Sequence, residues 1–194
     1  MNQHITATHQ LAHENWLKRY YFTRAGFSIA WVIAALTIAR SSPIASALLL
    51  VGYPVWDALA NFVDGQRGGG LATNITQLLN VLVSLTVAVA LVLALPEMHE
   101  VLAVFGAWAI LSGLLQLGTA ARRWKSSGGQ WAMILSGAQS AAAGGFFISQ
   151  AHLPAVPTIN TVVGYAGFGA LYFLVAALLL SFNHRRLRST ASRH

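Results

Sequence analysis

Four polar side chains in the stretch 53–67 could do chemistry, although the residues around them are mostly apolar. They are spaced four, four and three residues apart, so on a helix they share one face: Tyr53, Asp57, Asn61 and Asp64. A carboxylate exposed to hydrocarbon costs roughly 2.5–3.5 kcal/mol on insertion scales. The spacing therefore predicts a polar stripe that faces the interior of a helical bundle and finds partners there.

Amide side chains elsewhere in the chain match this stripe. Three of them repeat every three residues at the start of the next apolar run, and two more lie in later runs: Asn74, Gln77, Asn80, Gln116 and Gln139. Polar residues within membrane spans turn inward and pair with one another. We therefore expect these side chains to form one polar cluster with the stripe, in the cytoplasmic half of the bundle.

Two arginines are the predicted partners of the aspartates. A guanidinium stays charged and can hold a carboxylate through two parallel hydrogen bonds, so Arg24, one turn into the first apolar run, is expected to pair with Asp57. Arg67 follows Asp64 by three residues and is the expected partner of that carboxylate. Such a cluster either locks the helices together or binds a solute, an ion or protons. The other half of the spans is mostly Leu, Val and Ala, which argues against a path through the bundle.

The composition places these residues in a membrane protein. Hydrophobic residues make up 56% of the 194-residue chain and charged residues only 9%, against roughly 25% charged residues in soluble domains. Several apolar runs reach the ~20 residues that are needed to cross a bilayer. We predict an all-α bundle of six transmembrane helices, arranged as three hairpins, at 20–39, 44–63, 73–95, 101–121, 130–149 and 159–182. Residues 1–19 then form an amphipathic N-terminal segment, and residues 183–194 form a basic tail.

Positive charge predicts the orientation. Eleven of the twelve Lys and Arg residues fall on the side of the termini, and Arg40 alone falls on the other. Because Lys and Arg stay in the cytoplasm, both termini are expected there. The basic tail is suited to an anionic inner leaflet. These charges lie between apolar runs rather than in a motif that binds nucleic acid, so no nucleic-acid partner is expected.

Small residues predict close helix contacts in the last two spans. They recur at intervals of three or four residues: Gly137, Ala141, Gly145, Gly164 and Gly167. In membranes, helices associate through small residues that let their backbones approach. This pattern predicts tight packing within the chain, or a face for a second copy or another membrane protein.

The sequence offers little for catalysis or metal binding. It has no cysteine, and no histidine falls within a predicted span. His9 and His13 have the spacing of some zinc sites, but a solvated or interfacial segment is the expected reading. His99, beside Glu97, and His152 lie in the predicted outer loops and could titrate there. We expect a non-enzymatic protein without metal or cofactor.

Two stretches carry a resemblance. The segment 105–147, FGAWAILSGLLQLGTAARRWKSSGGQWAMILSGAQSAAAGGFF, resembles the HdeD-like family of small bacterial membrane proteins, in which helices rich in Trp, Gly and Leu alternate with short basic loops. The segment 19–36, RYYFTRAGFSIAWVIAAL, looks like the first helix of that family. The resemblance implies a six-helix protein of the bacterial inner membrane, without established enzymatic activity and with a link to acid resistance in one member.

Overall fold

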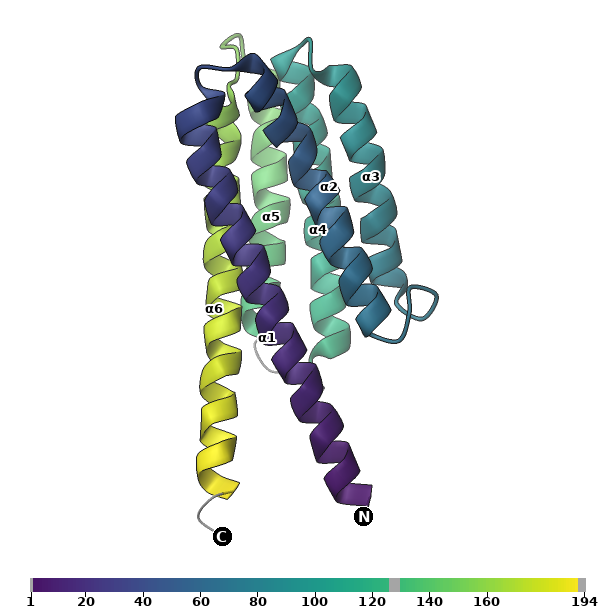
Figure 1. Ribbon diagram of the computed structural model, residues 1–194. Helices are drawn as coiled ribbons and strands as arrows, with labels where there is room; N and C mark the ends of the chain where they lie inside the picture. The colour runs from purple at the N-terminus through teal and green to yellow at the C-terminus, as the bar shows by residue number, and fades with distance from the viewer. Residues whose placement is uncertain (1, 126–129, 192–194) are drawn as a thin grey trace.

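The computed structural model describes the backbone of residues 2–125 and 130–191, and the side chains of residues 15–125 and 130–182. Within these residues every regular element is a helix (Figure 1). The helices are α1 (Asn2–Ala34), which continues into a π-helical turn η1 (Ala35–Ala39), α2 (Pro43–Arg67), α3 (Ile75–Ala94), α4 (Met98–Arg123), α5 (Gln130–Ala151) and α6 (Ile159–Ala191). The prediction of an all-α, six-helix bundle is confirmed.

All six helices contain a stretch long and apolar enough to cross a membrane. The chain is therefore a multi-pass membrane protein. The first helix is continuous from Asn2 to Ala34, so the predicted N-terminal segment and the first span belong to one helix. The side chains of residues 1–14 and of the basic tail from residue 183, including His9 and His13, lie outside the described part.

Consecutive helices run in opposite directions, and Figure 1 shows both ends of the chain on the same side of the bundle. We call this side the terminal end, and the opposite side, where α1 turns into α2, the far end. The most extensive helix contacts join α4 to α5, α1 to α6, and α2 to α3. The first and last helices are therefore direct neighbours, whereas the body of α1 contacts α2 only sparsely.

Local sequence signals explain where the helices begin. The hydroxyl of Ser42 accepts a hydrogen bond from the backbone N–H of Ala45 at 3.2 Å, and Pro43 follows at the first position of α2. The carboxylate of Glu97 caps α4 through the backbone N–H of His99 at 3.3 Å. These caps satisfy amide donors that have no partner within the helix.

Glycines set the close contact between α4 and α5. A Cβ atom added to Gly113 would lie 2.5 Å from the carbonyl oxygen of Gly137 and 2.8 Å from the backbone nitrogen of Ala141. Gly106 and Gly144 make a second contact of this kind one to two turns further along. Larger residues at these places would push the two backbones apart.

Three of the five predicted packing residues do not take part in such contacts. Gly145, Gly164 and Gly167 have nothing within 4 Å of the position that a Cβ would occupy. The prediction that they pack within the chain is wrong, because the spacing of small residues does not reveal which side of a helix faces its neighbour. Gly137 and Ala141 do lie at the α4–α5 contact, and Gly144 rather than Gly145 extends it.

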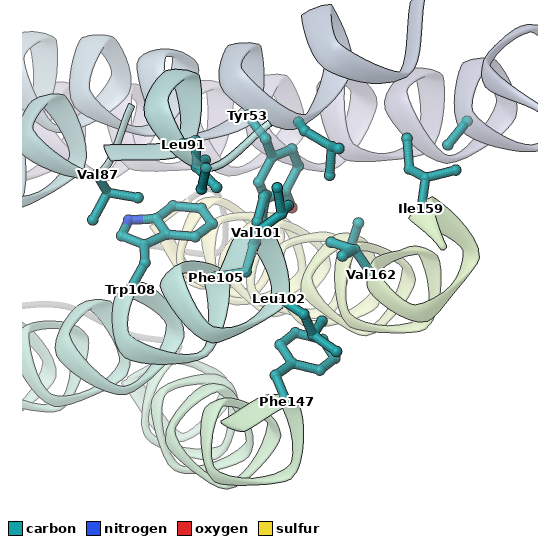
Figure 2. Packing of buried hydrophobic residues seen from close by; sticks show 14 of the residues in the cluster. Tyr53, Val87, Leu91, Val101, Leu102, Phe105, Trp108, Phe147, Ile159 and Val162 are labelled. Carbon is teal, nitrogen blue, oxygen red and sulfur yellow. The ribbon is translucent and has the colours of Figure 1, made fainter. Parts of the chain in front are cut away.

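Apolar side chains fill the far half of the bundle. Figure 2 shows aromatic rings and aliphatic side chains gathered between the helices: Tyr53, Val87, Leu91, Val101, Leu102, Phe105, Trp108, Phe147, Ile159 and Val162. A second apolar cluster lies nearer the terminal end and includes Leu17, Tyr21 and Phe173. Buried polar side chains, including Asp57, Asp64 and Gln77, lie in the terminal half of the bundle.

Candidate functional site

An ion pair between α1 and α2 is the centre of the polar cluster. The Nη2 atom of Arg24 donates to the Oδ1 atom of Asp57, as the sequence predicts. The other carboxylate oxygen accepts hydrogen bonds from Asn61 Nδ2 and Ser84 Oγ, both at 3.0 Å. Only 6% of the surface of Asp57 is exposed. Three helices thus supply partners to one buried carboxylate.

The partners of this ion pair extend to two further helices. Arg24 Nη1 donates to the hydroxyl of Tyr20 at 2.9 Å, and its guanidinium carbon lies 4.4 Å from the centre of the Phe173 ring on α6. On α4, Trp108 Nε1 donates to Ser84 Oγ at 3.0 Å. A cation over an aromatic face is stabilised by the ring's negative face. The ion pair is therefore held by side chains from α1, α2, α3, α4 and α6.

The second aspartate pairs with a residue that the sequence did not suggest. Asp64 Oδ2 accepts from Arg123 Nη2 at 2.7 Å and from Gln77 Nε2 at 3.1 Å. The prediction that Arg67 is its partner is wrong: Arg67 is exposed, and its guanidinium carbon lies 5.0 Å from the centre of the Trp16 ring. The fourth span is expected to end at 121, whereas α4 continues to Arg123 and buries its side chain.

The predicted amide stripe on α3 divides into separate roles. Asn74 lies just before α3 and secures the preceding loop, because its Nδ2 donates to the carbonyls of Gly68 and Gly70 at 2.8 and 2.9 Å. Its Oδ1 accepts from Arg122 Nη2 at 2.9 Å. Asn80 is buried deeper in the helix. Only the middle residue of the stripe, Gln77, contacts an aspartate directly.

The remaining predicted residues lie beside the ion pair rather than on it. The hydroxyls of Tyr53 and Ser28 are 3.2 Å apart, and the Tyr53 ring meets the Trp108 ring edge to face at 5.7 Å. Gln116 Nε2 faces the sulfur of Met133 at 3.7 Å, which is a weak acceptor. Gln139 is half-buried and lines a cavity in this region.

Two small cavities border the Arg24–Asp57 pair, with volumes of about 30 and 40 Å³. Both are lined by Arg24, Asp57, Ser112, Gln116 and Phe173. The first reaches toward Asp64 and Arg123, and the second toward Tyr53 and Tyr165. Cavities of this size hold one or a few water molecules. We call the two cavities and their lining the polar chamber.

Two polar atoms of the chamber lining lack a partner. Asn80 Oδ1 and Ser112 Oγ are buried and accept or donate no hydrogen bond among the residues that the structure describes. A buried polar group left unsatisfied costs roughly 1–3 kcal/mol. The lining also holds equal numbers of opposite charges, because Arg24 and Arg123 face Asp57 and Asp64. The chamber is thus electrically balanced but incompletely hydrogen-bonded.

The histidine predicted to titrate at the far end joins two loops. His99 Nδ1 lies 2.9 Å from Glu97 Oε1, and its Nε2 lies 3.0 Å from the carbonyl oxygen of Leu153. The hydrogen bond from His99 lowers the pKa of the Glu97 carboxyl below its ordinary value of 4.5. His152 instead contacts the carbonyl of Ile148, one turn back in its own helix. Within residues 15–125 and 130–182, no group of three His, Cys, Asp or Glu side chains could hold a metal ion.

Comparison of the chain with protein-family models, with curated proteins and with solved structures gave no match.

Proposed function

We propose that this protein is a non-enzymatic membrane protein that binds a small ion in the polar chamber. The observation that carries the proposal is a buried Arg24–Asp57 pair that borders two cavities whose lining leaves Asn80 Oδ1 and Ser112 Oγ unpaired. A network that only locked helices together would do so better with every member satisfied. Replacing a buried ion pair by well-packed apolar residues is often neutral or stabilising, so stability alone does not account for two such pairs.

The chemistry of the pair favours an anion that enters together with a proton. A cation that bound to Asp57 would leave Arg24 buried and charged without a partner, because a guanidinium does not lose its proton in proteins. An anion that bound to Arg24 would leave the Asp57 carboxylate without its cationic partner. That carboxylate can accept a proton and become neutral. An anion and a proton together also keep the chamber electrically balanced. This combination avoids an uncompensated buried charge.

The dimensions of the chamber restrict the ligand. Volumes of about 30 and 40 Å³ suit a monoatomic anion or one of a few atoms, such as chloride. The far half of the bundle is apolar, with Leu50, Leu91 and Phe105 fully buried. We infer that the ligand enters from the terminal end, and that release at the far end would need a rearrangement of helices.

Proteoliposome flux of chloride and protons tests this proposal. In the parent protein, an inward chloride gradient is expected to drive proton uptake, measured with a chloride electrode and a pH-sensitive dye inside the vesicles. Asp57→Asn resembles the protonated carboxyl, so it is expected to retain chloride movement and lose its coupling to protons. Arg24→Gln removes the anion-binding charge and is expected to abolish both. Arg40→Gln, at the far end and exposed, serves as the matched control.

The melting temperature of each variant in detergent is measured alongside the flux. Absence of chloride flux and chloride binding in a folded parent protein would contradict the proposal that the chamber binds this anion. Proton-coupled flux that persists in Arg24→Gln would reject the assigned site.

A structural, stress-associated role is the second candidate, and it follows from the resemblance to the HdeD-like family. Two observations favour it: both buried aspartates already pair with arginines, and the far half of the bundle is filled with apolar side chains. This candidate predicts that Asp57→Asn lowers the melting temperature and that neither protein moves chloride. The flux and melting experiments therefore separate the two candidates.

We further infer that the protein lies in a bacterial inner membrane with its terminal end in the cytoplasm. The basis is the excess of Lys and Arg on that side, which the positive-inside rule assigns to the cytoplasm. The anionic inner leaflet would then face the basic residues at the ends of the spans.

A further inference from the structure

A larger cavity lies at the terminal end and shares no lining residue with the polar chamber. Its volume is about 410 Å³, within the range of roughly 300–1,000 Å³ that is usual for small-molecule sites. Four of its lining residues come from α1 and one is the last residue of α2: Asn15, Trp16, Lys18, Arg19 and Arg67. We call it the basic pocket.

The basic pocket is strongly positive. Lys18, Arg19 and Arg67 contribute three cationic side chains, and no carboxylate is among the lining residues whose side chains the structure describes. Within the described side chains, no acidic group forms an ion pair with any of these three. Glu14, the residue before Asn15, has its side chain outside the described part. Three cations gathered around one cavity repel each other, and an anion in that cavity would relieve the repulsion.

Arg67 is held in place without using up its hydrogen-bond donors. Its guanidinium carbon lies 5.0 Å from the centre of the Trp16 ring, and Asp64, the nearest carboxylate in sequence, is occupied by Arg123 and Gln77. Stacking on an aromatic ring engages the face of a guanidinium and leaves its N–H edges available. Those edges match two oxygens of a phosphate group in a bidentate arrangement.

The position of the basic pocket relative to the membrane indicates which molecule would carry the phosphate. Arg67 is the last residue of α2, a helix long and apolar enough to cross a membrane, and it lies against Trp16 at this end of the bundle. Charged side chains at the ends of such helices reach the membrane interface. Lipid headgroups lie at this interface. Trp16 has the amphipathic ring that favours this level. We propose that the basic pocket binds the phosphate of an anionic lipid headgroup, independently of any ligand in the polar chamber.

The test measures lipid affinity in purified protein. Native mass spectrometry in neutral detergent gives the apparent Kd of short-chain phosphatidylglycerol for the parent and for a Lys18→Gln/Arg19→Gln/Arg67→Gln variant. Each removed charge is expected to raise the Kd about fivefold, so the triple variant should bind roughly a hundredfold more weakly. Lys125→Gln removes an exposed charge at the same end, outside the basic pocket, and should change the Kd less than twofold.

Two further measurements make the result decisive. Short-chain phosphatidylcholine, which has a phosphate but no net charge, is expected to bind more weakly than phosphatidylglycerol, and its Kd should change little in the triple variant. Inorganic phosphate at millimolar concentration is expected not to displace phosphatidylglycerol. Displacement by inorganic phosphate would show that the basic pocket binds free phosphate, and it would overturn the proposal that the ligand is a lipid headgroup. An unchanged phosphatidylglycerol Kd in the triple variant, with the melting temperature preserved, would overturn the site itself.

Discussion

Both buried aspartates depend on arginines from other helices. The exposed fractions of the side chains are 15% and 9% for Arg24 and Asp57, and 11% and 4% for Arg123 and Asp64. Removing one member of such a pair leaves the other charge without compensation in a medium that solvates it poorly. At this scale, the structure distinguishes arginines that hold the fold from arginines that face its surroundings.

Arg123→Gln and Arg67→Gln are expected to differ sharply in their effect on stability. Loss of Arg123 leaves Asp64 buried with only Gln77 as partner, and should lower the free energy of unfolding by about 3–5 kcal/mol. Loss of Arg67 removes an exposed contact with Trp16, worth at most about 1 kcal/mol. SDS titration in mixed micelles without added lipid measures both. Equal destabilisation by the two variants would contradict the assigned pairing.

The Glu97–His99 contact makes the far end sensitive to acid. Because the hydrogen bond lowers the pKa of Glu97, the contact contributes stability above pH 4.5 and loses that contribution as pH falls through the lowered pKa. Glu97→Gln is therefore expected to melt below the parent at pH 7, and the difference in melting temperature should shrink as the pH falls below 4.5. Glu100→Gln changes the same charge without removing this contact. A difference for Glu97→Gln that does not shrink as the pH falls would be inconsistent with this assignment.

The sequence alone predicted one ion pair and missed the other. Arg24 lies well inside an apolar run, so its charge requires a partner and Asp57 is at a suitable depth. Asp64 has an arginine three residues away, and proximity in sequence favoured Arg67 over Arg123, which is 59 residues away. Which of two arginines turns inward depends on how α3 and α4 pack, and the spacing of charges does not contain that information.

At the scale of helices, the most extensive contact is between α4 and α5. The glycines at this contact bring backbone atoms of the two helices together, as at Gly113 and Gly137. The sequence shows that α5 is rich in small residues, which fall into two sets one position apart: 137, 141 and 145, and 136, 140 and 144. Only the position of α4 selects Gly137 and Gly144 and leaves Gly145 facing outward.

Neighbouring glycines on α5 provide a matched pair of substitutions. In Gly144→Leu the added Cβ meets Ile110 Cγ1 at 2.7 Å, so the side chain should force α4 and α5 apart and cost about 1–3 kcal/mol or more. In Gly145→Leu the same side chain enters open space, and the change should stay within about 0.5 kcal/mol. Thermal unfolding in detergent compares the two. A larger loss in Gly145→Leu would show that this face is occupied, for example by a second copy.

At the scale of the whole molecule, hydropathy predicted the number and position of the helices well. The expected sixth span begins at Ile159 as α6 does, and the expected third span, 73–95, agrees with α3 (Ile75–Ala94) within two residues at each end. Larger differences occur where polar residues continue a helix, as at the start of α1 and the end of α4. At these places the helix continues, although hydropathy does not assign the polar residues to a membrane span.

The orientation of the bundle can be tested with single cysteines, because the chain has none of its own. Ser41→Cys lies in the far-end turn, and Lys125→Cys lies at the terminal end; both positions are exposed. In intact bacterial cells, a membrane-impermeant maleimide is expected to label Ser41→Cys and to label Lys125→Cys only after lysis. Labelling of Lys125→Cys in intact cells would place the terminal end outside.

The contact between the first and last helices has a consequence for biosynthesis. Ala39, the end of the first span, and Ile159, the start of α6, are 120 positions apart. At about 5–20 residues per second, α1 therefore waits roughly 6–24 s in the bilayer before its main neighbour emerges. Asp57 follows Arg24 by only 33 positions, about 2–7 s. The ion pair can thus retain α1 beside the growing bundle while translation of the remaining helices is completed.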